Sequence, residues 1–377
     1  MKLHKYLPIM AVLALMTVMV APVAHAQDGI EEKFCLITDV GSVTDGTFNQ
    51  FAYEGGIVVA EDLDLDFTFI ETQDPVDYAD NIDTCINDGA EAIITVGFLL
   101  QQDTLIAAEN NPDVFFIGID QFYPEGSPTN VAGVQFREDQ GGFLVGVLAA
   151  MVAEENGYDK VGGVYGIDIP PVKKFRNGFE QGVHYINPEL EISGVYVPSF
   201  EDRALGASTA EQLIGDGADI IFGAGGQTGS GGIEAAAAQE IYVIGVDKDE
   251  YFSTFTVNEP GDAPGAEFLI SSAIKRVDLG VIDLITALVE GNMDAFPGGS
   301  NYVMDAAIDG VDFAPAHDSD IDEGIYEQVQ EVKDLLASGE LETGVDPVSG
   351  DLMDMMEDMD MDEDMDEEAM ATEEADE

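Results

Sequence analysis

Two short segments of the chain recur at almost the same distance, and this repetition limits the possible folds more than any other feature. The stretch 88–94 (DGAEAII) returns at 216–222 (DGADIIF), and the stretch 116–120 (FIGID) returns at 243–247 (VIGVD), with offsets of 128 and 127 residues. Either match alone is weak, because joints between a helix and a strand look alike in many proteins. The agreement of the two offsets predicts two halves with a common topology.

Apolar runs that are typical of buried strands alternate with helical patterns along the chain. This rhythm predicts crossover connections and parallel sheets that helices cover on both faces. We therefore predict an α/β protein of two Rossmann-like lobes, with a ligand cleft at the carboxyl ends of both sheets. The strand-like runs are 34–38, 67–71, 92–96, 114–119, 161–165, 192–197, 220–222 and 242–246.

The N-terminus has the pattern of a secretory signal peptide. Lys2 and Lys5 precede an apolar run, and Ala24-His25-Ala26 offers the small residues that a signal peptidase reads. We predict that residues 1–26 are removed and that the protein is exported to the periplasm or the extracellular side. The first cysteine follows Glu32-Lys33-Phe34 rather than a lipobox, so we do not expect a lipoprotein.

The chain is strongly acidic, with 76 Asp and Glu against 13 Lys and Arg and a formal charge of −63. Such a charge excludes nucleic acid and other polyanions as partners. Residues 351–377 contain Asp, Glu and Met at high density, so we predict a disordered acidic tail there. The folded part is acidic as well, which suggests the hypothesis of a saline habitat where salt screens the repulsion.

Cys35 and Cys85 are the two cysteines of the chain. In an oxidising compartment they could form a disulfide between the first strand and the second helix. Two buried thiols are the alternative, and the sequence does not decide between them.

The loop after the first strand, 39–50 (DVGSVTDGTFNQ), combines flexible glycines with polar side chains and an aromatic ring. This loop resembles the motif that opens the binding lobe in the basic membrane protein family, the PnrA-like purine nucleoside receptors of bacterial ABC importers. The resemblance continues to about residue 315, although the acidic tail and the absence of a lipobox depart from it. Its further segments are 95–98, 116–120, 136–143, 169–172, 175–179, 224–229, 244–247 and 271–275.

The resemblance implies a type I periplasmic-binding-protein fold and an extracytoplasmic solute-binding protein that captures nucleosides, purines above all, between its lobes. We expect lobe 1 to comprise 34–137 and 250–298, and lobe 2 to comprise 138–249 and 299–345. An ABC permease would be the membrane partner. We expect a monomer without a cofactor and without enzymatic activity.

Asp120 and Asp247 end two equivalent strands, so each carboxylate is expected to face the cleft from its own lobe. A carboxylate accepts hydrogen bonds from a vicinal diol such as that of ribose, and it repels a phosphate. These two residues therefore favour a nucleoside over a nucleotide.

The resemblance further implies that Phe48 stacks on the base and that Asn49 and Asp45 contact the base edge. Phe175 and Phe222 are both candidates for the second ring, although an ordinary core position fits each of them better than a ligand contact.

The glycine run 223–232 follows a strand, and the resemblance implies that its glycines let the backbone approach the ligand, with Gly226 the expected contact and Gly97 a second one after an earlier strand. A dinucleotide site is the rival interpretation, but Thr228 stands where the third glycine of that fingerprint belongs. Lys275 is expected to pair with Asp247 or with a ligand oxygen, and a solvated helix lysine is its alternative.

Three other functions remain open from the sequence: an enzyme that processes nucleosides or uses a dinucleotide, a sensor, and a sugar-binding receptor of the same fold. His184 and His317 lie apart from the cysteines in sequence, and no serine has the setting of a nucleophile elbow. These observations favour binding over catalysis.

Overall fold

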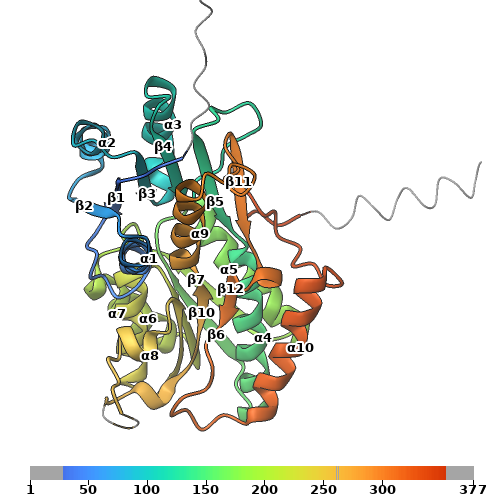
Figure 1. Cartoon of the computed structure of the whole chain (residues 1–377). Helices are drawn as coiled ribbons and strands as arrows, with labels where there is room; N and C mark the ends of the chain where they lie inside the picture. The colour runs from blue at the N-terminus through green and yellow to red at the C-terminus, as the bar shows by residue number, and fades with distance from the viewer. Residues whose placement is uncertain (1–28, 260, 262, 354–377) are drawn as a thin grey trace, which may run out of the picture.

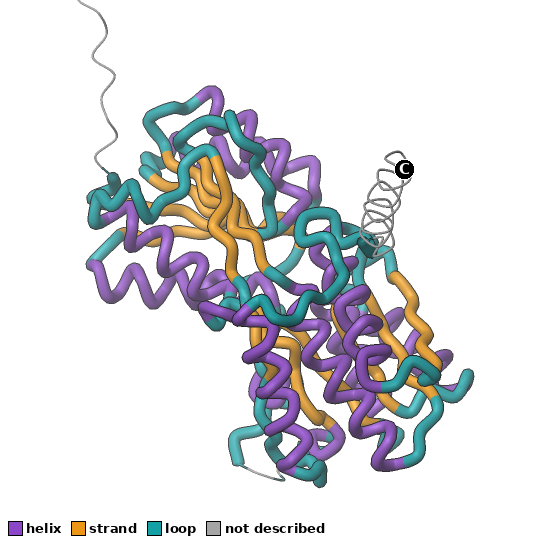
Figure 2. Tube along the Cα trace, turned by 90° about the vertical axis from the view of Figure 1, so that its right-hand side faces the viewer, coloured by secondary structure: helices purple, strands orange, loops and turns teal. Residues whose placement is uncertain are grey.

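A computed structural model describes residues 29–353 except 260 and 262. The predicted signal peptide and residues 354–377 of the predicted tail lie outside the described residues. The helices and strands form two α/β lobes that meet at the middle of the molecule (Figures 1 and 2).

Each lobe is built on a six-stranded sheet. The first sheet has the order β11-β5-β4-β3-β1-β2 and the second the order β12-β10-β9-β8-β6-β7. All neighbours pair in parallel except β10 and β12. The first sheet comprises β1 (Lys33–Val40), β2 (Asp66–Thr72), β3 (Ala92–Val96), β4 (Phe115–Ile119), β5 (Val131–Phe136) and β11 (Ser300–Met304). The second comprises β6 (Lys160–Tyr165), β7 (Glu191–Tyr196), β8 (Ile220–Ala224), β9 (Tyr242–Asp247), β10 (Leu269–Lys275) and β12 (Val311–Phe313).

Ten α-helices and four short 3₁₀ helices connect the described strands. The α-helices are α1 (Phe48–Leu63), α2 (Tyr78–Asn87), α3 (Gln101–Asn110), α4 (Glu138–Asn156), α5 (Pro170–Ile186), α6 (Arg203–Gly215), α7 (Gly226–Ala237), α8 (Glu250–Ser253), α9 (Val277–Val289) and α10 (Glu323–Ser338). The 3₁₀ helices are η1 (Pro75–Asp77), η2 (Phe98–Leu100), η3 (Ala266–Phe268) and η4 (Ala306–Ile308). No helix among the described residues is long and apolar enough to cross a membrane.

The two sheets repeat one strand order, as the internal repeat predicts. β1 to β5 of the first sheet correspond in sequence and in position to β6 to β10 of the second. The repeated segments 88–94 and 216–222 lead into β3 and β8, and the other repeated pair forms β4 and β9. The predicted α/β class with two parallel-sheet lobes is therefore confirmed.

The expected lobe boundaries are wrong in one respect. Segment 250–298 was expected in lobe 1, but its strand β10 pairs with β9 and belongs to the second sheet. Segment 299–345 was expected in lobe 2, but its strand β11 pairs with β5 in the first sheet. The reason is the repeat itself, because lobe 2 needs a fifth strand equivalent to β5 before the chain crosses back.

The chain consequently crosses between the lobes three times, at Arg137, Arg276 and Asp305. Arg137 N donates to Met304 O at 2.9 Å, and Arg276 N donates to Gly310 O at 2.9 Å, which holds the crossings together. From here on, lobe 1 denotes residues 29–136 and 277–304, and lobe 2 denotes residues 137–276 and 305–353.

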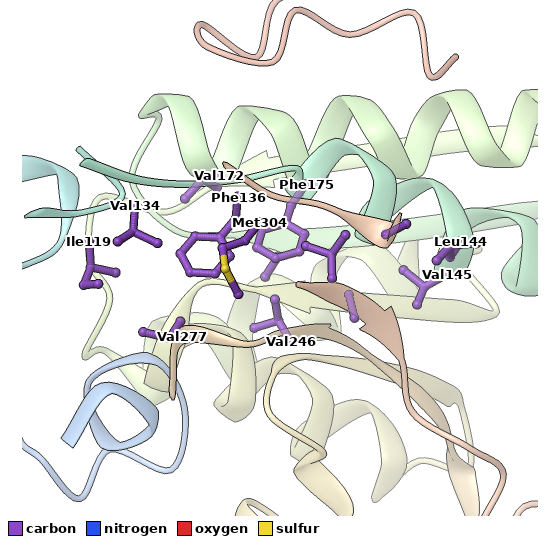
Figure 3. Close-up of a cluster of buried hydrophobic side chains, with 14 of the residues drawn as sticks. Ile119, Val134, Phe136, Leu144, Val145, Val172, Phe175, Val246, Val277 and Met304 are labelled. Atoms are coloured by element: carbon purple, nitrogen blue, oxygen red, sulfur yellow. The ribbon is translucent and has the colours of Figure 1, made fainter. Parts of the chain in front are cut away.

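A continuous apolar core lies beneath the crossings and joins the lobes. Phe136 and Met304 of lobe 1 lie beside Phe175 of lobe 2 in its middle, with Val246 below them (Figure 3). Burying large apolar side chains from both lobes in one cluster fixes the position of the hinge.

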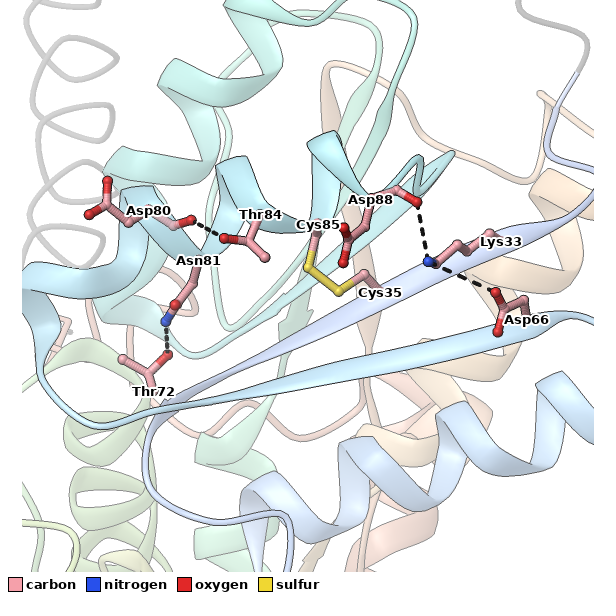
Figure 4. Close-up of a disulfide and its surroundings, with 9 residues drawn as sticks. All are labelled: Lys33, Cys35, Asp66, Thr72, Asp80, Asn81, Thr84, Cys85 and Asp88. Carbon is pink, nitrogen blue, oxygen red and sulfur yellow. Dashed lines mark hydrogen bonds and ion pairs between the residues drawn. A yellow bond between two sulfur atoms is a disulfide. The ribbon is translucent and has the colours of Figure 1, made fainter.

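Cys35 and Cys85 form a disulfide, which resolves the alternative that the sequence left open. It joins β1 to α2 with a Cα separation of 6.0 Å (Figure 4). Both residues are buried in a core cluster of lobe 1.

Candidate functional site

A cavity of about 730 Å³, including solvent at its mouth, lies between the lobes. The segments that follow β1, β3 and β4 line it from lobe 1, and the segments that follow β6, β7 and β8 line it from lobe 2 together with the ends of β9 and β10. This is the edge of a doubly wound sheet at which ligands bind. Its side chains come mainly from Asp39, Asp45, Phe48, Asn49, Phe98, Asp120, Ile169, Val172, Phe175, Phe200, Glu201, Gln227, Asp247 and Lys275.

Asp247 presents a carboxylate that has no hydrogen-bond partner among the described residues. It ends β9, lines the cavity and is 6% exposed. Burial raises the pKa of Asp247 to about 7, with the attraction of Lys275 opposing that rise. A buried carboxylate without a donor is costly, so this oxygen pair is prepared to accept hydrogen bonds from a ligand.

Asp120 lies at the equivalent position of lobe 1 but is already paired. Lys275 Nζ lies 2.7 Å from Asp120 Oδ2 and 2.9 Å from Glu138 Oε1. Lys174 Nζ continues this buried chain of alternating charges at 2.5 Å from Glu138 Oε2. Asp120 Oδ1 has no partner among the described residues, so one oxygen remains free to accept.

The expectation for Lys275 needs a correction. Lys275 was expected to pair with Asp247 or with a ligand oxygen, with a solvated helix lysine as the alternative, whereas it is buried at the end of β10 and pairs with Asp120 and Glu138. Burial alone would lower the pKa of Lys275, but these two carboxylates raise it above its ordinary value. Its ammonium also lies 4.8 Å from the centre of the Phe48 ring and 4.9 Å from that of Phe136.

The start of α1 brings three predicted residues to the cavity. Asp45 Oδ1 accepts from Thr47 N at 2.9 Å and from Gln50 N at 3.0 Å, and its Oδ2 accepts from Asn49 N at 3.0 Å. Asp45 therefore acts as a helix cap, and its contact with a base edge remains a prediction. Asn49 Oδ1 is buried without a partner among the described residues and is the better placed acceptor.

Phe48, Phe175 and Phe200 line the cavity, but Phe222 does not. Phe222 is fully buried and packs against Tyr165, Phe175 and Phe179 with ring centres 5.1 to 6.3 Å apart. The interpretation of Phe222 as a ligand ring is thus wrong, because its side chain points into the lobe 2 core.

Gly97 lines the cavity as expected, and its backbone has a φ of +115°. A Cβ at this position would lie 2.8 Å from Asp39 Oδ2, so a larger residue would displace that carboxylate. Asp39 is the second-last residue of β1, accepts from Val40 N at 2.7 Å and from the Tyr78 hydroxyl, and has a pKa raised by burial. Glycine at 97 therefore preserves the position of a cavity carboxylate.

The glycine run 223–232 is helical from Gly226 onward rather than a loop. Its glycines permit close packing with α6, since a Cβ at Gly231 would lie 2.4 Å from Arg203 O. Gly226 itself lines the cavity with a φ of +56°, as the prediction of a ligand contact requires.

Sequence reasoning missed Asp39, Phe200, Glu201 and Gln227 as cavity residues. Asp39 lies at the carboxyl end of β1 and the pair Phe200-Glu201 follows β7, so the general expectation that the ends of strands form the site contained the necessary hint. Gln227 lies inside the glycine run, which was interpreted through its glycines alone. Among the described residues, no group of three or more His, Cys, Asp or Glu is arranged to hold a metal ion.

Comparison with known proteins assigns the chain to a family. A family model described as "ABC transporter substrate-binding protein PnrA-like" matches residues 34–342. The chain belongs to this family. The predicted family resemblance is confirmed, and because PnrA-like proteins are substrate-binding components of ABC transporters, the expectation of a non-enzymatic protein is confirmed as well.

Individual relatives agree with this assignment. The nucleoside-binding protein BmpA of an ABC transporter in Lactococcus lactis is 28% identical over 81% of this chain and 85% of its own. The CD4+ T-cell-stimulating antigen of Listeria monocytogenes is 29% identical over 83% of this chain and 88% of its own. A crystal structure of an ABC transporter solute-binding protein from Aeropyrum pernix superposes with a TM-score of 0.70 at 26% identity, over 83% of this chain and 93% of that one. This PnrA-like protein therefore has the type I periplasmic-binding fold.

Proposed function

We propose that the interlobe cavity captures a nucleoside and that the closed protein delivers it to an ABC permease. The observation that carries the proposal is the unpaired carboxylate of Asp247, which faces the cavity at 6% exposure. Together with Asp120 Oδ1 and Asn49 Oδ1, it offers acceptors that lack donors among the described residues. Hydroxyl pairs of a ribose and N–H groups of a base would satisfy them.

The aromatic part of the cavity supports a flat ligand. Phe48 enters from lobe 1, and Phe175 and Phe200 enter from lobe 2. A base between rings from opposite lobes would gain stacking energy only when the lobes are closed. Binding would therefore favour the closed form, as expected for a receptor that a permease recognises by its shape.

The charge of the cavity supports a nucleoside without phosphate. Asp39, Asp45, Asp120, Asp247 and Glu201 contribute carboxylates. Of the described residues that line it, Lys275 is the one cation, and its ammonium already contacts Asp120 and Glu138. A phosphate would meet repulsion without a free cation to bind it.

Export through a signal peptide and a position outside the cytoplasmic membrane are part of the proposal, as is a monomeric state. The Lactococcus lactis relative, whose name describes nucleoside binding, supports the ligand class.

Calorimetric titration with purine and pyrimidine nucleosides tests the proposal, with a free pentose and a nucleoside 5′-phosphate as controls. We expect binding of nucleosides, and affinities for both controls that are lower by at least about a hundredfold. Binding of the pentose with equal affinity would instead favour a sugar receptor, and release of free base during the titration would favour an enzyme.

A further inference from the structure

Two cross-lobe contacts join the region of α1 to lobe 2, one of them between the cavity residues Asp45 and Gln227. Figure 1 draws α1 directly above α7 and α8, which belong to the other lobe. Lys248 Nζ of lobe 2 donates to Glu54 Oε2 of lobe 1 at 2.6 Å. Gln227 Nε2 of lobe 2 donates to the carbonyl oxygen of Asp45 in lobe 1.

Lys248 contacts residues of α1 that other contacts already hold in place. Gln50 Nε2 donates to Glu54 Oε1 at 2.8 Å, and Gln50 is itself held because its Oε1 accepts from Gly46 N at 3.0 Å. Since Lys248 donates to Oε2, both carboxylate oxygens of Glu54 have a donor. The ammonium of Lys248 lies 5.3 Å from the centre of the Phe51 ring. The lysine side chain is 16% exposed and that of Glu54 is 40% exposed, so solvent screens the ion pair in part and its contribution is modest.

Lys248 is also the direct neighbour of the proposed ligand carboxylate. Lys248 N donates to Val246 O at 2.8 Å across Asp247, whose φ is +63°. A three-residue turn with a positive φ at its centre is rare and strained, and such strain persists only where surrounding contacts impose it. The backbone of this turn therefore connects the direction of the Asp247 carboxylate with that of the Lys248 side chain.

We propose that Lys248 and Glu54 form a clamp that couples occupation of Asp247 to closure of the lobes. The proposal rests on the function proposed above. Lys248 is a positioning residue in this scheme, since it acts on the ligand through the turn and through lobe closure. The clamp forms only in the closed protein, so its loss speeds escape of the ligand more than it slows entry.

A double-mutant cycle measured by stopped-flow binding of the nucleoside tests the clamp. Lys248→Gln and Glu54→Gln should each raise the dissociation rate about three- to tenfold with little change in the association rate. The double variant should resemble the single ones, because each removes the same contact. Lys248→Arg should restore most of the slow dissociation, since arginine retains the charge.

Lys160→Gln is the matched control. Lys160 pairs with Glu191 at 4.0 Å within lobe 2, so this change removes one positive charge without touching a cross-lobe contact. Its dissociation rate should equal that of the wild type. Wild-type rates in both single variants, or a double variant whose effect is the product of the single effects, would overturn the clamp.

Small-angle X-ray scattering of the ligand-free protein separates this inference from the proposed function. The clamp holds part of the ligand-free population closed, so its loss should raise the radius of gyration of Lys248→Gln and Glu54→Gln, but not that of Lys160→Gln. If the wild type binds no nucleoside, the proposed function fails, and an unchanged radius of gyration in the two variants would then overturn the clamp as well.

Discussion

Asp120 and Asp247 stand at equivalent ends of β4 and β9, each with a φ of +63°, but of these two carboxylates only that of Asp120 pairs with Lys275. The repeated fold thus places two carboxylates symmetrically, and one lysine from the end of β10 makes them different. Asp120 is held in a buried chain of charges at the hinge. Asp247 is left as an acceptor without a donor among the described residues, so we propose it as the stronger of the two ligand contacts.

The affinity for a nucleoside should depend on pH through Asp247. Burial raises the pKa of this carboxyl to about 7, and ligand donors would stabilise its ionised form. Binding should therefore release a proton near pH 7, and the affinity should fall as pH drops from 8 to 5.5, by up to about tenfold per pH unit below the pKa. Titration calorimetry in two buffers of different ionisation enthalpy measures the released proton. An affinity that is constant over this range would contradict the role of Asp247.

The rings of the two lobes should respond differently to truncation. Phe48→Ala removes a cavity ring and should weaken nucleoside binding by about ten- to a hundredfold while the melting temperature changes little. Phe222→Ala removes a fully buried core ring and should lower the free energy of unfolding by about 3–5 kcal/mol. Thermal denaturation and calorimetry on both variants check the contrast. If Phe48→Ala lowered the free energy of unfolding as much as Phe222→Ala, Phe48 would be a core residue rather than a ligand contact.

Reduction of the Cys35–Cys85 disulfide should destabilise lobe 1. The bond closes a loop with a sequence separation of 50, so its loss through Cys35→Ser with Cys85→Ser should cost about 2–4 kcal/mol of unfolding free energy. The cavity lies at the other end of the strands, and binding at low temperature should persist. Denaturant unfolding with and without reductant measures the effect, and an unchanged midpoint would refute it.

Salt should strengthen ligand binding, because both lobes carry large charges of one sign. Lobe 1 contains 25 Asp and Glu and one lysine, and lobe 2 contains 36 Asp and Glu against ten Lys and Arg. Repulsion between the lobes opposes closure, and molar salt shortens its range to about 3 Å. Salt also weakens the Lys248–Glu54 pair, and we expect the relief of repulsion between many carboxylates to exceed this single loss. Titrations from 0.05 to 1 M KCl should show an affinity that rises several-fold, and a falling affinity would contradict the interpretation.

The repeat at offsets of 127 and 128 was sufficient to predict the two-lobed architecture and the site at the ends of the strands. It placed Asp120 and Asp247 correctly in one cavity. The crossing points were not predictable in the same way, because β10 follows a long connection after β9 and its partner is decided by sheet pairing across the whole lobe.

Side-chain roles were harder to predict than positions. Sequence cannot distinguish Phe222, which points into the core, from Phe200, which lines the cavity, since the direction of a side chain depends on the register of its element. The partner of Lys275 was missed for a related reason. Lys275 lies between Asp120 and Glu138, and the position of Glu138 at the start of α4 is a feature of the folded hinge rather than of the local sequence.

The unpaired carboxylate at the end of β9 is the centre of this account, and one substitution tests it. Asp247→Asn keeps the shape of the side chain and removes the charge that accepts the ligand donors. Titration calorimetry with a purine nucleoside should give an affinity about ten- to a hundredfold below that of the wild type, with a melting temperature at pH 8 that is equal or higher. An Asp247→Asn variant that binds the nucleoside as tightly as the wild type would contradict the account.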